Sequence, residues 1–278
     1  MSAGLFLAGL SLNGVSVGYG GRPVLSGLDL PAVAPGSVVA LLGANGAGKS
    51  TLLKAMAGLG GATGRPAGQI VLNGQDLVGM TLEQRVHAVG YLPQALPQGS
   101  SLVAYEAVLS AVRAVRPDTP RDHVEASIER VFDTLGLRPL ALRRLRELSG
   151  GQRQMIGLAQ VLVRNPRLLL LDEPTSALDL RWQLTVLETV RRIADAERSI
   201  CVIAIHDINL ALRFCDHVVV LGHGRVLASG PPTHALDPDV LRHAYGIEAR
   251  VEQCSRGFRL VLADRALPDA GRAAPPFQ

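Results

Sequence analysis

The sequence predicts an α/β fold with a parallel β-sheet at its centre, and three observations lead to this prediction. Apolar runs at 38–42, 168–171 and 200–205 have the length of strands. They are apolar at consecutive positions, which is typical of strands buried on both faces of a sheet. Each run is followed by glycine or by a polar residue, and parallel sheets bind ligands where the carboxyl ends of their strands meet. We therefore expect a functional site along this edge.

Three parts are predicted along the chain. Residues 1 to about 40 alternate apolar and polar residues between glycine-rich turns, which favours an antiparallel β layer. Residues about 41–95 and about 165–230 are expected to supply the parallel sheet and its flanking helices. The stretch between them, about 96–164, is predicted to be a helical insertion.

Boundary signals locate some of these helices. In the insertion, Thr119-Pro120 is a good helix start and Gly136 a stop. The apolar residues between them have helical spacing: Val124, Ile128, Val131, Phe132 and Leu135. Later, 236–241 predicts a capped helix start, and 244–251 predicts a turn into a strand. The last residues, 270–278, contain glycine and adjacent prolines and are predicted to be disordered.

Residues 43–50 read Gly-Ala-Asn-Gly-Ala-Gly-Lys-Ser and predict a phosphate-binding loop. Its glycines allow successive backbone N–H groups to turn toward one anion. A helix sequence at 50–57, closed by Gly58, follows, and its N-terminus adds partial positive charge. Lys49 is expected to reach the β- and γ-phosphates of a nucleotide, and the hydroxyl of Ser50 to reach Mg²⁺.

Polar residues at the other strand ends complete the expected site. Asp172, directly after the run at 168–171, should reach Mg²⁺, usually through water, and Glu173 should orient or deprotonate the attacking water. His206 follows the third run and should contact the γ-phosphate. Gln94 follows a further predicted strand and is expected to touch Mg²⁺ or the water.

A second motif, Leu-Ser-Gly-Gly-Gln at 148–152, lies about twenty residues before Asp172. With the phosphate loop it makes the chain resemble the nucleotide-binding subunits of ABC transporters, over about residues 8 to 250. The family's other motifs occur in its order: Tyr19, Gln94, the acidic pair, Ser176-Ala177-Leu178-Asp179 and His206. The resemblance implies an ATPase domain at 1–250 with a phosphate-loop NTPase core, an N-terminal antiparallel β subdomain and an inserted α-helical subdomain. Residues 251–278 would form a C-terminal extension.

The resemblance also implies roles for single residues. Tyr19 would stack on adenine. Ser149 and Gly151 would clamp the γ-phosphate of a nucleotide held by another copy of the chain, and Asp179 would couple the two sites. Both sites would be completed only in a head-to-tail homodimer with two-fold symmetry. No catalytic position departs from the family pattern, so we expect active hydrolysis.

The expected site is therefore as follows. The residues expected to bind ATP are Tyr19, Gly43, Asn45, Gly46, Gly48, Lys49, Ser50, Thr51, Ser149, Gly151 and Asp179. The residues expected to act in catalysis are Lys49, Gln94, Glu173 and His206, and those expected to reach Mg²⁺ are Ser50, Gln94 and Asp172.

The resemblance further implies a membrane permease as partner, docked on the helical insertion, and a place on the cytoplasmic face of the cell membrane. A periplasmic or surface substrate-binding protein would take part indirectly. The stretch 236–251, with Ala-Tyr-Gly-Ile-Glu, is similar to the ATPases of metal-chelate importers. Among their cargoes a ferric siderophore is expected, with haem and cobalamin as alternatives. Many siderophore ATPases have an Arg-Gly-Arg-type stretch where this chain has Ala-Tyr-Glu-Ala-Val-Leu-Ser at 104–110, so the permease and the cargo stay open.

Composition weighs against other classes of protein. The chain has 28 Lys+Arg and 24 Asp+Glu, a net charge of +4, without the clustered arginines and interleaved aromatics of a nucleic-acid surface. Its densest basic cluster, 138–146, is expected on a solvated or partner-facing surface. Three scattered cysteines show neither metal-ligand spacing nor a disulfide framework. The remaining alternatives are another ABC transporter, such as an exporter, and a non-transport ABC ATPase acting on DNA or the ribosome.

Overall fold

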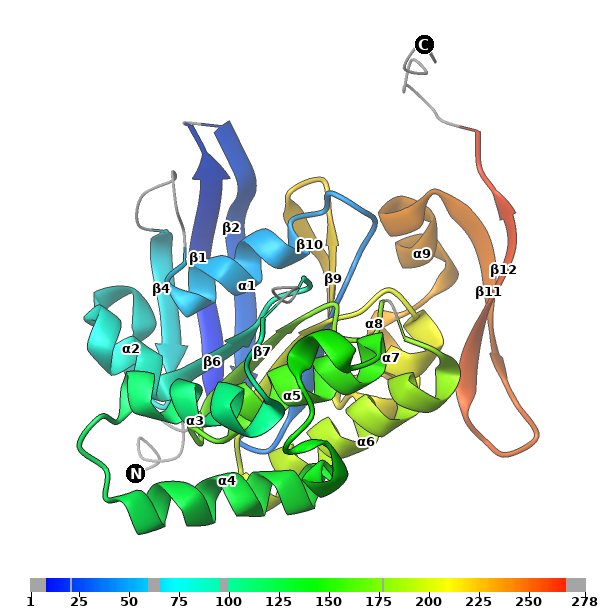
Figure 1. Cartoon of the computed structure of the whole chain (residues 1–278). Coiled ribbons are helices and arrows are strands. Elements are labelled where there is room, and N and C mark those ends of the chain that lie inside the picture. Colours follow the sequence, from blue (N-terminus) through cyan, green and yellow to red (C-terminus); the bar gives the residue numbers. More distant parts are fainter. Residues whose placement is uncertain (1–8, 21, 60–65, 96–99, 177, 269–278) are drawn as a thin grey trace, which may run out of the picture.

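The structure, a computed structural model, describes residues 9–20, 22–59, 66–95, 100–176 and 178–268 (Figure 1). Its strands are β1 (Leu10–Tyr19), β2 (Arg22–Val33), β3 (Val38–Leu42), β4 (Ala67–Leu72), β5 (Gln75–Asp76), β6 (Val89–Leu92), β7 (Leu168–Asp172), β8 (Ile200–Ala204), β9 (His217–Gly222), β10 (Arg225–Gly230), β11 (Ile247–Gln253) and β12 (Arg259–Ala266). Its helices are α1 (Lys49–Ala57), α2 (Leu82–Ala88), α3 (Ala104–Val115), α4 (Arg121–Leu135), α5 (Gly150–Leu162), α6 (Leu180–Glu197), α7 (Ile208–Phe214), α8 (Pro232–Ala235) and α9 (Pro238–Tyr245).

A central sheet in the order β10-β9-β3-β8-β7-β6 carries the site. The strands from β9 to β6 pair in parallel, and β10 is added antiparallel to β9 at one edge. The predicted α/β fold with a parallel core is confirmed. The three apolar runs of the sequence become β3, β7 and β8, which are neighbours, so their carboxyl ends meet at one edge.

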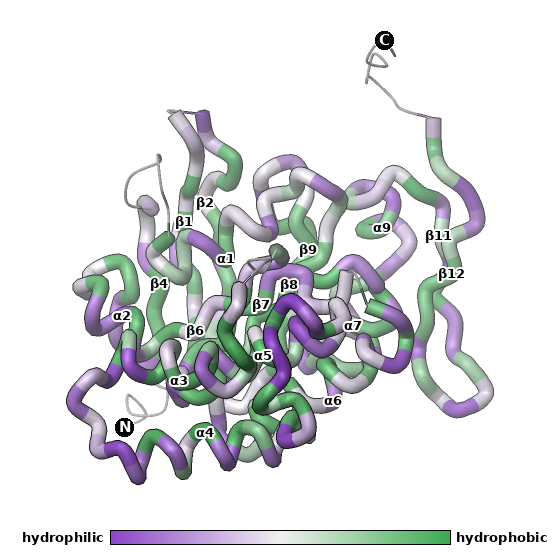
Figure 2. The backbone as a smooth tube through the Cα atoms, in the orientation of Figure 1, coloured by the Kyte–Doolittle hydropathy of each residue, from purple (hydrophilic) through white to green (hydrophobic). Residues whose placement is uncertain are grey.

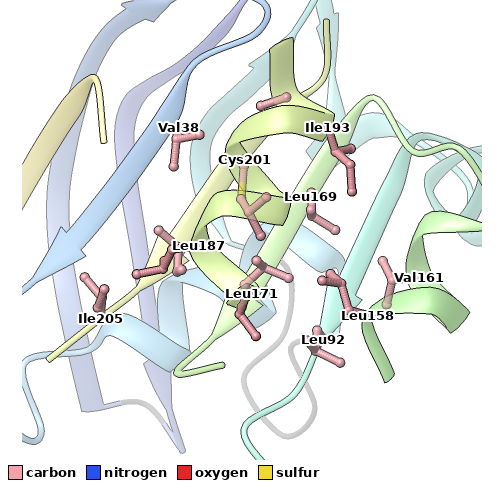
Figure 3. Close-up of a cluster of buried hydrophobic side chains, with 14 of the residues drawn as sticks. Val38, Leu92, Leu158, Val161, Leu169, Leu171, Leu187, Ile193, Cys201 and Ile205 are labelled. Atoms are coloured by element: carbon pink, nitrogen blue, oxygen red, sulfur yellow. The ribbon is translucent and has the colours of Figure 1, made fainter. Parts of the chain in front are cut away.

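The central strands are apolar throughout because both faces of the sheet are covered. Leu169 and Leu171 of β7 pack into a core with α5 and α6 (Figure 3), whereas Leu168 and Leu170 pack into a second core with α1 and the antiparallel sheet. Figure 2 shows hydrophobic colour along β7 and β9, while α4 alternates between hydrophilic and hydrophobic turns. The two cores fix β7, which ends in Asp172, from both sides.

A second sheet, in the order β2-β1-β4-β5, forms the antiparallel layer. The sequence expectation placed its end near residue 40 and gave 41–95 to the parallel sheet, and this is wrong for 67–76. After α1 the chain returns as β4 and pairs antiparallel with β1, with Leu72 opposite Leu10. The physical reason is burial: Ile70 and Leu72 complete the apolar face that β1 and β2 present to α1.

The insertion folds into α3, α4 and α5, as predicted. Helix α4 starts after Pro120 and ends at Gly136, which has φ 66°. Its apolar stripe is buried, and Phe132 lies against Tyr105 of α3 with ring centroids 6.1 Å apart. The unusual stretch 104–110 forms the first turns of α3, where Ala104, Ala107 and Val108 are buried and Glu106 and Ser110 are exposed.

The C-terminal part begins with the predicted capped helix. The side chain of Asp237 accepts from the N–H of Val240 at the start of α9, and Gly246, with φ 66°, ends the helix. The predicted strand follows as β11 and pairs antiparallel with β12. Helix α9 packs on β9 and β10, and β12 packs on α7 (Figure 1). The predicted disordered end, 270–278, lies outside the described residues.

No helix in the described ranges is long and apolar enough to cross a membrane.

Candidate nucleotide-binding and catalytic site

The phosphate loop connects the end of β3 to the first turn of α1, as its sequence predicts. Gly43 has φ 141°, and a Cβ atom there would lie 2.4 Å from the carbonyl oxygen of Leu221 on β9. Gly48, just before α1, has φ 98°. Both positions therefore require glycine, because an L side chain meets either backbone strain or a steric clash. Helix α1 starts without a side-chain cap, which leaves its first N–H groups for an anion.

Lys49 lies inside this loop and is 5% exposed. Its Nζ donates to the carbonyl oxygens of Gly43, at 2.8 Å, and of Ala44, at 3.2 Å. Burial lowers the pKa of Lys49, while the charges of Glu173 and Asp172 raise it. The loop carbonyls thus fix the Lys49 amine inside the loop, beside the start of α1.

Asp172 ends β7 and is 2% exposed. Its Oδ1 accepts from the hydroxyl of Ser50 at 2.8 Å, and its Oδ2 accepts from the hydroxyl of Tyr91 at 3.0 Å. Burial, then the charge of Asp172 and this hydrogen bond, raise the pKa of Tyr91. Sequence reasoning missed Tyr91. The sequence places Tyr91 on the predicted strand before Gln94, but it does not show that this strand lies next to β7 in the sheet.

Glu173 has φ 50°, the left-handed region that side chains other than glycine rarely adopt. Such a conformation costs on the order of 1–3 kcal/mol and is concentrated at functional sites. The Glu173 side chain is 11% exposed, and its Oε1 lies 2.6 Å from His206 Nε2. Its Oε2 accepts from Gln94 Nε2, also at 2.6 Å. The structure therefore brings together three predicted residues from the ends of β6, β7 and β8, which are adjacent strands.

The signature residues form a separate group on α5. Ser149 caps this helix: its hydroxyl accepts from the N–H of Gln152 while the Gln152 side chain accepts from the N–H of Ser149. Gly151 is buried, and a Cβ there would lie 2.6 Å from the ring of Trp182. Asp179 caps α6 by accepting from the N–H of Trp182 at 2.9 Å. Trp182 therefore joins the signature helix to the segment that carries Asp179.

The predicted site residues thus fall into two sets. In the described part of the chain, no hydrogen bond or ion pair joins Tyr19, Ser149 or Asp179 to Lys49, Asp172 or Glu173. Tyr19, at the end of β1, is 42% exposed. Asn45 and Gly46 are exposed on the loop, and Thr51 is half-buried in the first turn of α1.

Sequence reasoning also missed Tyr245, the last residue of α9. Its hydroxyl accepts from the N–H of Gly43 at 2.9 Å, although the two residues are 202 positions apart. Burial raises the pKa of Tyr245 to about 12, so the hydroxyl stays protonated and neutral near pH 7. The N–H of Gly43 is used within the chain, and Gly43 serves the loop through its conformation.

The residues at the strand ends also suit a magnesium ion. Ser50 and Asp172 place a hydroxyl and a carboxylate together, and Mg²⁺ prefers such hard oxygen ligands with water and substrate phosphates in its remaining positions. Across the described ranges, no three His, Cys, Asp or Glu side chains gather into a metal site of their own.

Comparison with known proteins agrees with this geometry. The family described as "ABC transporter" matches residues 28–176. The chain is 37% identical over 250 residues to the hemin import ATP-binding protein HmuV of Bordetella pertussis, covering 87% of this chain and 94% of the relative. It is 38% identical over 260 residues to HmuV of Pseudomonas fluorescens, covering 91% and 99%. It is 36% identical over 270 residues to the cobalamin import ATP-binding protein BtuD of Halobacterium salinarum, covering 95% and 65%.

Solved structures give the same result. A metal-chelate type ABC transporter in an inward-facing conformation matches with a TM-score of 0.78 and 26% identity, over 92% of this chain and 98% of that chain. The protein cbiO1 of Clostridium perfringens matches with a TM-score of 0.72 and 27% identity, over 81% and 88%. This chain belongs to the ABC transporter family, as an ATP-binding subunit with the ABC ATPase fold. It is an ATPase, and it resembles the ATP-binding proteins of metal-chelate importers.

Proposed function

We propose that this chain is the ATP-hydrolysing subunit of a bacterial ABC importer that takes up a metal chelate. The observation that carries the proposal is the convergence of Gln94, Glu173 and His206 at three neighbouring strand ends, with contacts of 2.6 Å. Glu173 is the water-activating carboxylate. The oxygen of water bonds to the γ-phosphorus while a proton of the water passes to Glu173. The bond between the γ-phosphorus and the bridging oxygen breaks, and ADP and inorganic phosphate are released.

The other residues of the site hold the nucleotide in this proposal. Lys49 and the free N–H groups at the start of α1 bind its phosphates, and Tyr19 stacks on adenine. Ser50, Asp172 and Gln94 are the protein groups that reach Mg²⁺, which neutralises phosphate charge when bound. The contact between Ser50 and Asp172, at 2.8 Å, supports this arrangement.

Two copies of the chain close around two Mg-ATP. Ser149 caps α5 and Gly151 lies in its first turn. Among the described residues, neither makes a hydrogen bond to the catalytic residues of its own chain, and Ser149 is exposed. The N-terminus of α5 therefore suits the γ-phosphate of a nucleotide bound by the second copy. Asp179, joined to the signature helix through Trp182, couples the two sites.

A membrane permease is the proposed partner, docked on the helical insertion at the cytoplasmic face of the cell membrane. Arg138, Arg143, Arg144 and Arg146 are exposed on this insertion, which agrees with a solvated or partner-facing surface. A substrate-binding protein outside the membrane delivers the cargo and does not touch this chain.

The proposed cargo is a metal chelate, and the names of the similar proteins suggest which chelate to test first. The sequence favoured a ferric siderophore, with haem and cobalamin as alternatives. The relatives at 36–38% identity are named for hemin and cobalamin import. We therefore propose haem as the first candidate cargo, and cobalamin and a ferric siderophore as the alternatives to be tested beside it.

Co-purification tests this function. Tagged Glu173→Gln protein is isolated with Mg-ATP from detergent-solubilised membranes of its host, with Lys49→Ala as the control in which ATP binding is weakened. We expect a polytopic permease of the metal-chelate class with the first variant, and less of it with the second. Uptake of hemin, cobalamin and a ferric siderophore by cells with and without the chain then separates the cargoes. Ribosomal or DNA-bound proteins without a permease would overturn the transport function.

A further inference from the structure

We propose that the C-terminal segment 238–267 is a positioning element of the ATPase site, acting through two contacts that we call braces. Tyr245 of α9 holds the phosphate loop, and Val261 of β12 holds the helix that follows His206. The inference rests on the proposed roles of Lys49 and His206. It gives a task to a part of the chain whose residues lie outside the nucleotide-binding and catalytic motifs.

The first brace acts on a single residue, Gly43. Its N–H donates to the hydroxyl of Tyr245, and its carbonyl oxygen accepts from Nζ of Lys49. Gly43 is buried, so without Tyr245 its N–H would be left without a partner and away from water. Because Tyr245 and Lys49 share this residue, a shift of Tyr245 moves an acceptor on which the Lys49 ammonium rests.

Tyr245 is itself held from both sides. Leu241 and Ala244, on the preceding turn of α9, are buried against the core. Gly246 ends the helix directly after Tyr245, and its carbonyl oxygen accepts from the N–H of Leu267 at 2.8 Å. The chain directly after β12 is thus hydrogen-bonded to the residue that follows Tyr245. The position of its hydroxyl therefore depends on the whole segment.

The second brace lies beside His206. Asn209, in the first turn of α7, makes a two-way contact with the backbone of Val261: its Oδ1 accepts from the N–H at 2.7 Å, and its Nδ2 donates to the carbonyl oxygen at 3.2 Å. Asp207, adjacent to His206, caps the same turn by accepting from the N–H groups of Asn209 and Leu210. Strand β12 therefore fixes the first turn of α7, which directly follows His206 and Asp207.

The two braces act on different groups, so they predict a split in kinetics. Tyr245→Phe removes only the hydroxyl group, and with it the hydrogen bond that holds Gly43, the residue that Lys49 contacts. We expect it to raise the Kd and the KM for ATP about fivefold or more, with a smaller effect on kcat. Asn209→Ala loosens the His206 side, and we expect it to lower kcat by about threefold or more, with a smaller effect on KM.

The test uses the full purified chain, with ATP binding by calorimetry and steady-state hydrolysis as the two measurements. Tyr105→Phe, which removes a hydroxyl from α3, is the control. A purely structural role of the segment predicts that Tyr245→Phe and Asn209→Ala lower the temperature of unfolding but bind and hydrolyse ATP like the wild type while folded. Positioning predicts a raised KM in Tyr245→Phe and a lowered kcat in Asn209→Ala, measured at a temperature where each variant is fully folded, and leaves Tyr105→Phe like the wild type.

The outcomes separate this inference from the proposed site. If Lys49→Ala loses ATP while Tyr245→Phe binds it as tightly as the wild type, the brace on the phosphate loop is refuted and the site stands. Equal changes of KM and kcat in Tyr245→Phe and Asn209→Ala would refute the division of tasks. If Lys49→Ala itself binds ATP normally, the assignment of the phosphate loop fails, and the inference fails with it.

Discussion

The phosphate loop and the signature helix each present a helix N-terminus, but the two are held in different ways. Helix α1 starts without a side-chain cap, and the residues around its start contact β7 and α9 through Asp172 and Tyr245. Helix α5 has a local cap, in which the side chains of Ser149 and Gln152 accept from each other's backbone N–H groups. One N-terminus is therefore fixed by distant parts of its own chain, whereas the other is capped by its neighbours in sequence.

This difference separates two kinds of function within one site. Changes around α1 should alter the binding of nucleotide by a single chain, because the contacts to Asp172 and Tyr245 that hold this region lie within the same chain. Changes at the start of α5 should leave this binding unaltered and act only when a second copy supplies the phosphate. The following variants test the comparison, from the largest expected effect to the smallest.

Glu173→Gln should lower ATP turnover by roughly 10²–10⁴-fold, because the amide keeps the shape of the carboxylate but cannot take the proton of water. Binding of ATP should remain, and gel filtration with Mg-ATP should show a trapped dimer. Turnover and elution volume are the measurements, with the wild type as reference. A monomer in the presence of Mg-ATP would contradict the shared-site proposal.

Lys49→Ala should weaken ATP binding by about tenfold or more and abolish turnover, because a buried charge-assisted contact to phosphate is lost. Lys54 is the matched control, since it is the chain's other lysine and lies half-buried on the same helix. Lys54→Ala should bind ATP like the wild type. Tight binding by Lys49→Ala would show that the phosphate loop is misassigned.

Ser149→Arg should spare ATP binding by the single chain and lower turnover by about tenfold or more, because its long side chain obstructs closure of the dimer. Ser149→Ala is the smaller change: it removes the cap of α5 and should cost about 1 kcal/mol of stability. Binding, turnover and thermal unfolding separate these effects. Full activity of Ser149→Arg would exclude a role of the signature helix.

Tyr91→Phe should have the smallest effect. The variant removes the hydroxyl that donates to Oδ2 of Asp172. The carboxylate keeps its hydrogen bond from Ser50 but is less firmly oriented. We expect the Mg²⁺ concentration that gives half-maximal hydrolysis to change by about two- to fivefold. Tyr105→Phe, which removes a hydroxyl from α3, serves as the control. An unchanged Mg²⁺ titration would show that Tyr91 does not orient Asp172.

Local patterns in the sequence determined much of this protein. The glycines and Lys49 of the phosphate loop, the stop of α4 at Gly136 and the cap of α9 at Asp237 each depend on neighbours in the chain. Consecutive apolar residues gave β3, β7 and β8 because burial on both faces leaves a direct trace in composition. Polar residues at their ends then indicated Asp172 and Glu173.

Tertiary structure alone decided the contacts between distant segments. The pairing of β4 with β1, the hydrogen bond from Tyr91 to Asp172 and the two C-terminal braces have no periodic signal, since each needs only one suitable group at the right place. A tyrosine hydroxyl or an asparagine amide finds its partner through the packing of whole elements. Residues 202 positions apart, such as Gly43 and Tyr245, meet only after the central sheet and α9 have assembled.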